Sequence, residues 1–114
     1  METLVNMRCV ACRRDAPKVT VAETAEFQPQ VPDWVLLERD DIPRLERQYT
    51  FGDFATALAF TDKVGALAEE EAHHPDLLTA WGSVTVTWWT HKIRGLHRND
   101  FIMAAKTDQL YASG

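Results

Sequence analysis

The stretch "GDFATALAFTDKVGALAEEEAHHPDLLTAW" (residues 52–81) decides the fold, because a long helical pattern stops abruptly there and a strand pattern follows. Apolar and small residues recur every three or four positions from residue 53 to residue 72, which predicts one helix with an apolar face. Pro75 cannot continue a helix and biases His74 toward an extended backbone, so the helix should end near His73. Two histidines are therefore expected at a junction between a helix and a strand.

Two apolar stripes run along this predicted helix. The first is continuous and is expected to lie on a sheet; it comprises Phe54, Ala57, Leu58, Thr61, Gly65, Ala68 and Ala72. The second lies to one side and comprises Phe60, Val64 and Leu67. Its residues would cover the sheet edge, contact another subunit or simply add to the core.

A hairpin is predicted on each side of the helix. The segments "WVLLER" (34–39) and "RLERQYTF" (44–51) are typical of short strands, and the intervening "DDIP" suits a turn. The segments "LLTAW" (77–81) and "SVTVTWWTH" (83–91) flank Gly82 and predict a second hairpin.

Side chains alternate along a strand, which assigns the last predicted strand two different faces. Val84, Val86 and Trp88 should lie under the helix. His91 should end the strand on the opposite, more polar face, where a ligand or partner could reach it.

The predicted order is β-β-α-β-β-α, which indicates the α+β class and a four-stranded antiparallel sheet with helices on one face. A last helix is expected at residues 99–111, with Asp100 in its first turn, where a negative charge favours the helix dipole. Residues 1–30 are expected to form an N-terminal arm with one short helix near residues 22–27, and residues 31–114 a single domain.

Composition narrows the function classes. The net charge of −5 and the isoelectric point near 5.3 argue against a nucleic-acid backbone as partner, which would require clustered Lys and Arg. No apolar run approaches the roughly 20 residues needed to span a bilayer, and the N-terminus lacks the apolar segment of a signal peptide. A cytoplasmic protein with no membrane partner is expected.

Other motifs offer little chemistry. Cys9 and Cys12 form "CVAC", which is half of a zinc site or a redox pair without the preceding strand; a reduced pair in the arm is the simpler interpretation. No G-x-S-x-G nucleophile motif or phosphate-binding glycine loop occurs. His97 precedes the last helix and is interpreted as solvated or as a helix-start residue.

Three histidines can converge in this topology, because His73 and His74 end a helix and His91 ends a strand. Glu69 lies one helical turn before His73, where it could hold that imidazole in one tautomer. Imidazoles suit general acid and base catalysis near neutral pH.

The aromatic rings of Trp81 and Trp89 could stack on a flat heterocycle. Two alternatives for the histidines stay open. The pair could be a capping or surface feature, or three His and Glu69 could ligate zinc, although adjacent side chains diverge.

The order of these motifs resembles that of pterin-4a-carbinolamine dehydratases, in particular their bacterial members. The resemblance rests on "E-x-x-x-H-H-P" at residues 69–75, an aromatic at Trp81, "T-H" at Thr90 and His91, "G-L" and then Asp100 before the last helix. It covers about residues 34–111 and includes "YTFGDFATALAFTDKVGALAEE" upstream.

The resemblance implies dehydration of 4a-hydroxytetrahydrobiopterin to quinonoid dihydropterin, without metal or organic cofactor, in tetrahydropterin recycling for aromatic amino acid hydroxylation. By motif position, His73, His74 and His91 match the active-site histidines of the family, and Glu69 and Asp100 match its associated acids. Our hypothesis for the roles is that His73 and His91 exchange protons, that His74 binds and orients the pterin, and that Glu69 holds His73. Trp81, Thr90 and Asp100 would join His74 in contacting the substrate.

The sequence departs from the family pattern at Leu77, often Trp in relatives, at Trp81, where Tyr is common, and at Lys92, which replaces an acid. The family also implies a homodimer or homotetramer and an aromatic amino acid hydroxylase in the same pathway. A non-catalytic dimerisation, coactivator or scaffold module of the same fold is the alternative function.

Overall fold

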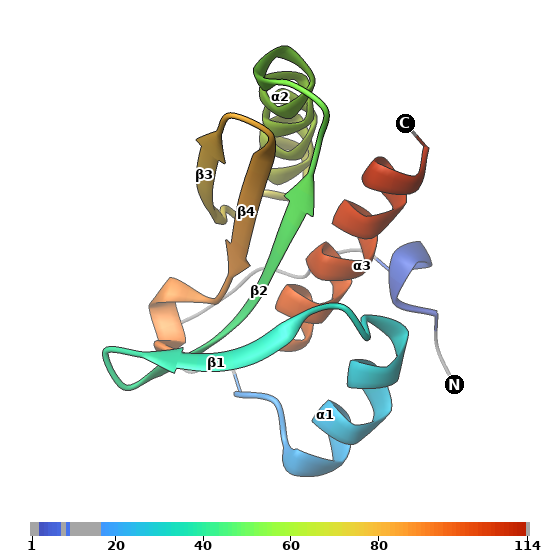
Figure 1. Cartoon of the computed structure of the whole chain (residues 1–114). Coiled ribbons are helices and arrows are strands. Elements are labelled where there is room, and N and C mark those ends of the chain that lie inside the picture. Colours follow the sequence, from blue (N-terminus) through green and yellow to red (C-terminus); the bar gives the residue numbers. More distant parts are fainter. Residues whose placement is uncertain (1–2, 8, 10–16, 114) are drawn as a thin grey trace.

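The computed structural model describes residues 3–7, 9 and 17–113. In this part of the chain a four-stranded antiparallel sheet carries helices on one face, as predicted (Figure 1). The elements run in the order η1 (Leu4–Asn6), α1 (Val21–Phe27), η2 (Gln28–Gln30), β1 (Val35–Arg39), β2 (Ile42–Thr50), α2 (Phe54–Glu71), β3 (Asp76–Ala80), β4 (Ser83–Trp88), η3 (His91–Ile93) and α3 (Arg98–Ala112).

The sheet order is β1-β2-β4-β3, so the second strands of the two hairpins pair at the centre of the sheet. In the first hairpin Arg39 pairs with Ile42, and only Asp40 and Asp41 form the turn, both with positive φ. The residues of "DDIP" were expected to form the whole turn, but Ile42 and Pro43 belong to β2. Two residues suffice because a left-handed pair matches the twist of the flanking strands.

The core lies between the sheet and the helices. Val84, Val86 and Trp88 of β4 are fully buried, which confirms the predicted inner face of this strand. Leu45 and Tyr49 of β2 lie beside them, and the buried residues of α3 include Phe101 and Ile102.

The buried face of α2 combines residues of both predicted stripes. Ala57 and Ala68 of the first stripe are buried as expected. Phe60 and Val64 of the side stripe also belong to the core, which is one of the roles left open for that stripe, whereas Phe54 and Leu58 of the first stripe are 44% and 45% exposed. Helix α2 contacts both the sheet and α3, and this turns its Phe60 side inward. The apolar pattern covers too much of the helix surface to fix its rotation without these neighbours.

Part of the N-terminal region contributes to this core. Leu4 is fully buried, its backbone N–H donates to Gln30 Oε1 at 2.9 Å, and η1 lies beside α3 (Figure 1). The short helix expected near residues 22–27 is α1, and its Phe27 packs on Phe101 with ring centroids 5.6 Å apart. Cys12 lies outside the described residues. In the described part of the chain, no helix has both the length and the apolar character to cross a membrane.

Candidate active site

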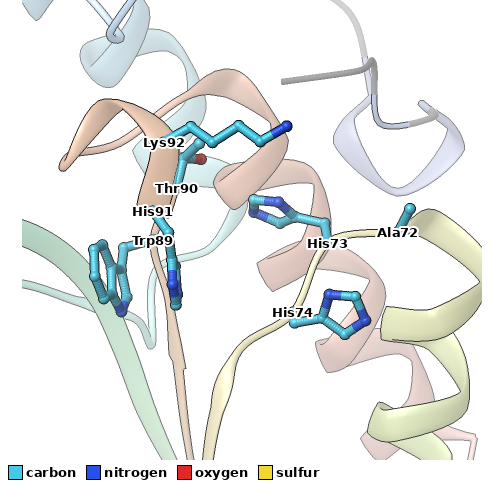
Figure 2. A pocket seen from close by; sticks show the side chains of 7 residues that line it. All are labelled: Ala72, His73, His74, Trp89, Thr90, His91 and Lys92. Carbon is cyan, nitrogen blue, oxygen red and sulfur yellow. The ribbon is translucent and has the colours of Figure 1, made fainter. Parts of the chain in front are cut away.

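A pocket of about 280 Å³ opens where the end of α2 meets the segment that follows β4 (Figure 2). Its lining residues are Ala72, His73, His74, Trp89, Thr90, His91 and Lys92. The three predicted histidines therefore converge on one pocket from two separate segments, residues 72–74 and 89–92. Trp81 does not line it; this residue lies in the β3–β4 turn and is 74% exposed.

The end of α2 explains how the two adjacent histidines diverge. Ala72 adopts a left-handed conformation with φ of 53°, and its N–H bonds back to the last turn of the helix. The N–H of His73 donates to the carbonyl of Ala68 at 3.1 Å, which completes a Schellman-type ending. The left-handed residue is normally Gly, so the alanine costs about 1 kcal/mol here. It reverses the chain and points His73 inward.

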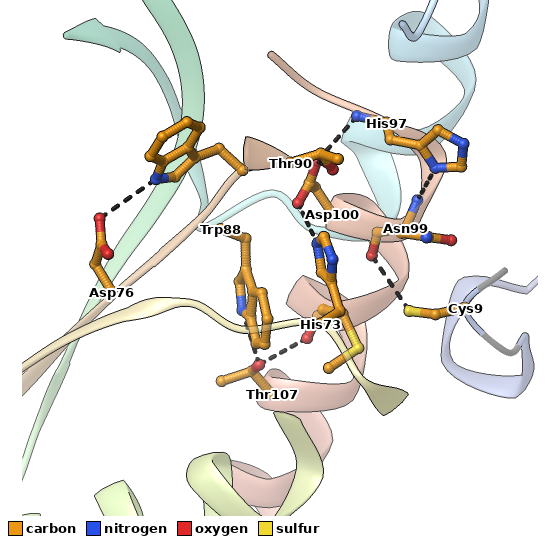
Figure 3. Close-up of polar contacts among 11 residues, drawn as sticks. Cys9, His73, Asp76, Trp88, Thr90, His97, Asn99, Asp100 and Thr107 are labelled. Carbon is orange, nitrogen blue, oxygen red and sulfur yellow. Dashed lines mark hydrogen bonds and ion pairs between the residues drawn. The ribbon is translucent and has the colours of Figure 1, made fainter. Parts of the chain in front are cut away.

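His73 is the buried histidine of the pocket, 8% exposed. Its Nε2 lies 2.7 Å from Asp100 Oδ1, and its ring stacks on Trp88 at 5.6 Å with an interplanar angle of 6° (Figure 3). A carboxylate can only accept, so the fitting tautomer carries its proton on Nε2 and leaves a lone pair on Nδ1.

Asp100 is itself fully buried and held by two further donors. Thr90 Oγ1 donates to its Oδ2 at 2.7 Å, and the backbone N–H of His97 donates to the same oxygen at 2.9 Å (Figure 3). These contacts join the segment after β4 to the start of α3. Asp100 and Thr90, both expected at the site, thus form the polar support under His73.

Glu69 contacts a different histidine from the one predicted. Its Oε2 lies beside Nε2 of His74, not of His73, so the expected Glu69–His73 contact is wrong. The helical spacing would bring Glu69 to His73 only if the helix continued to that residue, but α2 ends at Glu71 and Ala72 is left-handed. The Glu69–His74 pair is largely exposed at the pocket rim, with 78% and 61% of the two side chains accessible.

His91 begins η3 instead of ending β4 as predicted. Strand β4 stops at Trp88, and Thr90 forms an isolated bridge with Gly95 that closes a short loop around η3. The His91 ring lies against the indole of Trp89, with centroids 3.9 Å apart and planes 14° apart. Trp89 was predicted as a ring that could stack on a flat heterocycle, but one face of its indole is occupied by His91.

His97 is the N-cap residue of α3, which confirms its interpretation as a helix-start residue and excludes the solvated one. It is 7% exposed, and its Nδ1 accepts from the N–H of Asn99 at 3.0 Å (Figure 3). Burial lowers the pKa of His97 below 6.5, with Arg98 and His73 acting in the same direction and Asp100 and Glu23 opposing.

The sequence predicted the three histidines of the pocket but not the residues that contact His73. The His73–Asp100 contact joins residues 27 positions apart, and the His73–Trp88 stack joins a helix end to a strand. No local spacing reports such contacts. No group of three or more His, Cys, Asp or Glu among the described residues has the arrangement of a metal site.

Comparison with known proteins gives one consistent result. A family model described as "Pterin 4 alpha carbinolamine dehydratase" matches residues 17–110. A protein of Nitrosococcus oceani named "Putative pterin-4-alpha-carbinolamine dehydratase" is 63% identical over 110 residues, which cover 96% of this chain and 97% of that protein.

Two solved structures share the fold. The crystal structure of a transcriptional coactivator/pterin dehydratase from Brucella melitensis matches with a TM-score of 0.72 and 30% identity, over 82% of this chain and 98% of that one. A pterin dehydratase-like protein, identified as a RuBisCO assembly factor in the alpha-carboxysome, matches with a TM-score of 0.58 and 29% identity, over 69% of this chain and 92% of that one. The chain belongs to the pterin 4 alpha carbinolamine dehydratase family.

Proposed function

We propose that the protein dehydrates 4a-hydroxytetrahydrobiopterin, a pterin 4a-carbinolamine, to quinonoid dihydropterin. The observation that carries the proposal is the convergence of His73, His74 and His91 on one pocket. Its volume of about 280 Å³ lies just under the roughly 300–1,000 Å³ of pockets for drug-sized ligands, which suits a smaller bicyclic ring. Family membership supports a pterin as the substrate.

The reaction needs one proton donor and one proton acceptor. The C4a–O bond breaks and the hydroxyl leaves as water after it receives a proton. N5 loses its proton, and its electron pair forms the C4a=N5 double bond. The number of protons on the protein is unchanged over one turnover, so a pair of imidazoles can complete the cycle without any other reagent.

His73 is the base of this proposal. Its Nε2 is engaged by Asp100, which leaves the lone pair on Nδ1 to accept the N5 proton. The carboxylate also stabilises the imidazolium that forms when the proton arrives. A buried base held by a buried acid keeps its position between turnovers.

His91 is the acid that protonates the departing hydroxyl, and His74 binds and orients the pterin. Glu69 holds the exposed ring of His74 at the rim. Thr90 supports both the acid and the base, because it directly precedes His91 in the chain and donates a hydrogen bond to Asp100, which holds His73. Metal and organic cofactors have no part in this mechanism.

Turnover of the carbinolamine tests the proposal against a blank, because the uncatalysed dehydration is appreciable. His73→Ala and His91→Ala should each lower kcat by about 10²–10⁴-fold, the usual contribution of one general acid or base. His74→Ala should raise KM more than it lowers kcat, because its role is binding. Thermal unfolding of each variant checks that it folds.

Two outcomes would refute the proposal. Full rates in both His73→Ala and His91→Ala would remove the acid and base. Activity lost on treatment with a chelator and restored by zinc would replace the imidazole mechanism with a metal site.

A non-catalytic role is the second candidate. It is favoured by the two structural relatives, whose descriptions name a transcriptional coactivator and a RuBisCO assembly factor. In that case the wild-type protein would not exceed the blank rate.

We also propose, from family membership, that the protein forms a homodimer or homotetramer. Its dehydration reaction would serve tetrahydropterin recycling together with an aromatic amino acid hydroxylase.

A further inference from the structure

His91 is held in a different way from the other two histidines of the pocket. Carboxylates contact the rings of His73 and His74. Among the described residues, the ring of His91 accepts or donates no hydrogen bond, and its neighbour is the indole of Trp89. Thr90, the residue between Trp89 and His91, has an extended backbone, so the two side chains project to the same side and can stack.

The indole of Trp89 carries a second group. The guanidinium carbon of Arg44, on β2, lies 4.4 Å from the centre of the ring. One face of an indole cannot hold two groups at about 4 Å without overlap, so Arg44 and His91 lie on opposite faces. Figure 2 shows His91 between Trp89 and the other two histidines of the pocket.

The Arg44–Trp89 pair is anchored to the sheet. Asp76 Oδ2 accepts a hydrogen bond from Trp89 Nε1 at 3.3 Å and lies 3.7 Å from the guanidinium of Arg44. The same guanidinium donates to the carbonyl of Arg39 at 3.2 Å. Only 9% of the Arg44 side chain is exposed, so the cation is confined against the indole. The indole has little freedom to tilt.

We propose that Trp89, backed by Arg44, is the positioning residue that holds the His91 ring in the orientation for proton exchange with the substrate. The inference rests on the proposed function, because it assigns a task to His91 in that reaction. A carboxylate would fix an imidazole by occupying one of its nitrogens. Stacking restrains the plane of the ring and leaves both nitrogens without a partner among the described residues, so one can meet the substrate and the other solvent.

The test compares Trp89→Leu with Trp89→Phe. Leucine removes the flat surface, so kcat should fall about tenfold while KM changes less than twofold, as expected for misplacement of a proton-transfer group. Phenylalanine keeps a stacking face and should restore most of kcat. NMR of the His91 ring provides the independent readout: its C–H proton signals should lose their ring-current shift in Trp89→Leu and keep part of it in Trp89→Phe.

Arg44→Met tests the backing group without touching the stacked pair, and it covers the case in which Trp89→Leu does not fold. It should lower kcat about threefold and broaden or shift the His91 signals, because the indole is released on one face. Arg39→Met is the matched control. Arg39 lies in the same hairpin and pairs with Glu46 instead of Trp89, so this variant should behave as the wild type.

The positioning role is wrong if the His91 signals stay in place in Trp89→Leu, or if Trp89→Phe loses as much kcat as Trp89→Leu. A wild-type protein that does not exceed the blank rate would overturn the proposed function, and with it the catalytic part of this inference. The NMR signals would still report whether Trp89 holds the ring, so the two failures are distinguishable.

Discussion

Asp100 selects the tautomer of His73 and thereby which ring nitrogen carries the lone pair. The carboxylate is fully buried and receives hydrogen bonds from Thr90 and from the backbone of His97, so its position is set before any substrate arrives. Its remaining contact, at 2.7 Å, is with His73 Nε2. A neutral side chain at this position could not select the same tautomer so strongly.

Asp100→Asn should therefore lower kcat by about 10²-fold or more, since an amide can donate to His73 Nε2 and move the ring proton to Nδ1. Steady-state kinetics measure the loss, and ¹⁵N chemical shifts of the His73 ring report the tautomer. Asp62→Asn, an exposed change on α2, is the control and should keep the wild-type kcat. An Asp100→Asn protein with an unchanged tautomer and kcat would contradict this role.

At the scale of elements, the start of α3 joins helix capping to the site. His97 caps the helix through Nδ1, which must be unprotonated to accept from Asn99. Its backbone N–H meanwhile binds Asp100, the N3 residue of the capping box. Protonation of His97 removes the cap next to the residue that holds His73.

This cap predicts a pH dependence of stability. Burial lowers the pKa of His97 from its ordinary 6.5, so between the two pKa values the unfolded chain binds more protons than the folded one. The contribution of His97 is complete above pH about 6.5 and is lost as the pH falls through the lowered pKa. Urea unfolding between pH 7 and about pH 5 measures it.

His97→Asn keeps a neutral capping acceptor, so the free energy of unfolding of this variant should change less between pH 7 and about pH 5 than that of the wild type. The comparison with the wild type separates His97 from every other group that titrates in the same range. Equal slopes in the two proteins would show that His97 does not couple protonation to folding.

At the scale of the whole molecule, Asp108 of α3 holds the helix to the sheet. Its Oδ1 accepts from Trp34 Nε1 at 2.9 Å, from Arg47 at 2.7 Å and from the hydroxyl of Tyr49. Burial and the neighbouring Asp108 raise the pKa of Tyr49, so its phenol remains a donor across the physiological range. One carboxylate thereby joins β2, the segment before β1 and the end of α3.

Asp108→Ala should lower the free energy of unfolding by about 2–4 kcal/mol, because three donors lose their acceptor. Asp108→Asn keeps an oxygen acceptor and should cost about 1 kcal/mol. Urea unfolding with an unchanged m value measures both. Because the pocket is formed by other residues, folded Asp108→Asn should retain its kcat. Equal stabilities for the alanine variant and the wild type would show that the three contacts contribute little.

Much of the architecture follows from local patterns. The alternation in "SVTVTW" and the stop at Pro75 are properties of short segments, and they predicted the inner face of β4 and the junction that carries His73 and His74. The buried face of α2 was predicted only in part: Ala57 and Ala68 are buried as expected, but Phe54 is exposed and Phe60 is buried. Phe60 and Phe54 are equally apolar, so only contact with α3 and the sheet selects between them.

The sequence by itself determined the order of the elements, the α+β class and the three histidines of the pocket, because these depend on spacing within each segment. Only the tertiary structure decided which partner each histidine has: Asp100 for His73, Glu69 for His74 and Trp89 for His91. The first of these contacts depends on how α3 packs beside the sheet, and the second on the left-handed turn at Ala72. The sequence therefore predicts which side chains lie at the site. Their protonation and orientation depend on neighbours that folding brings from distant parts of the chain.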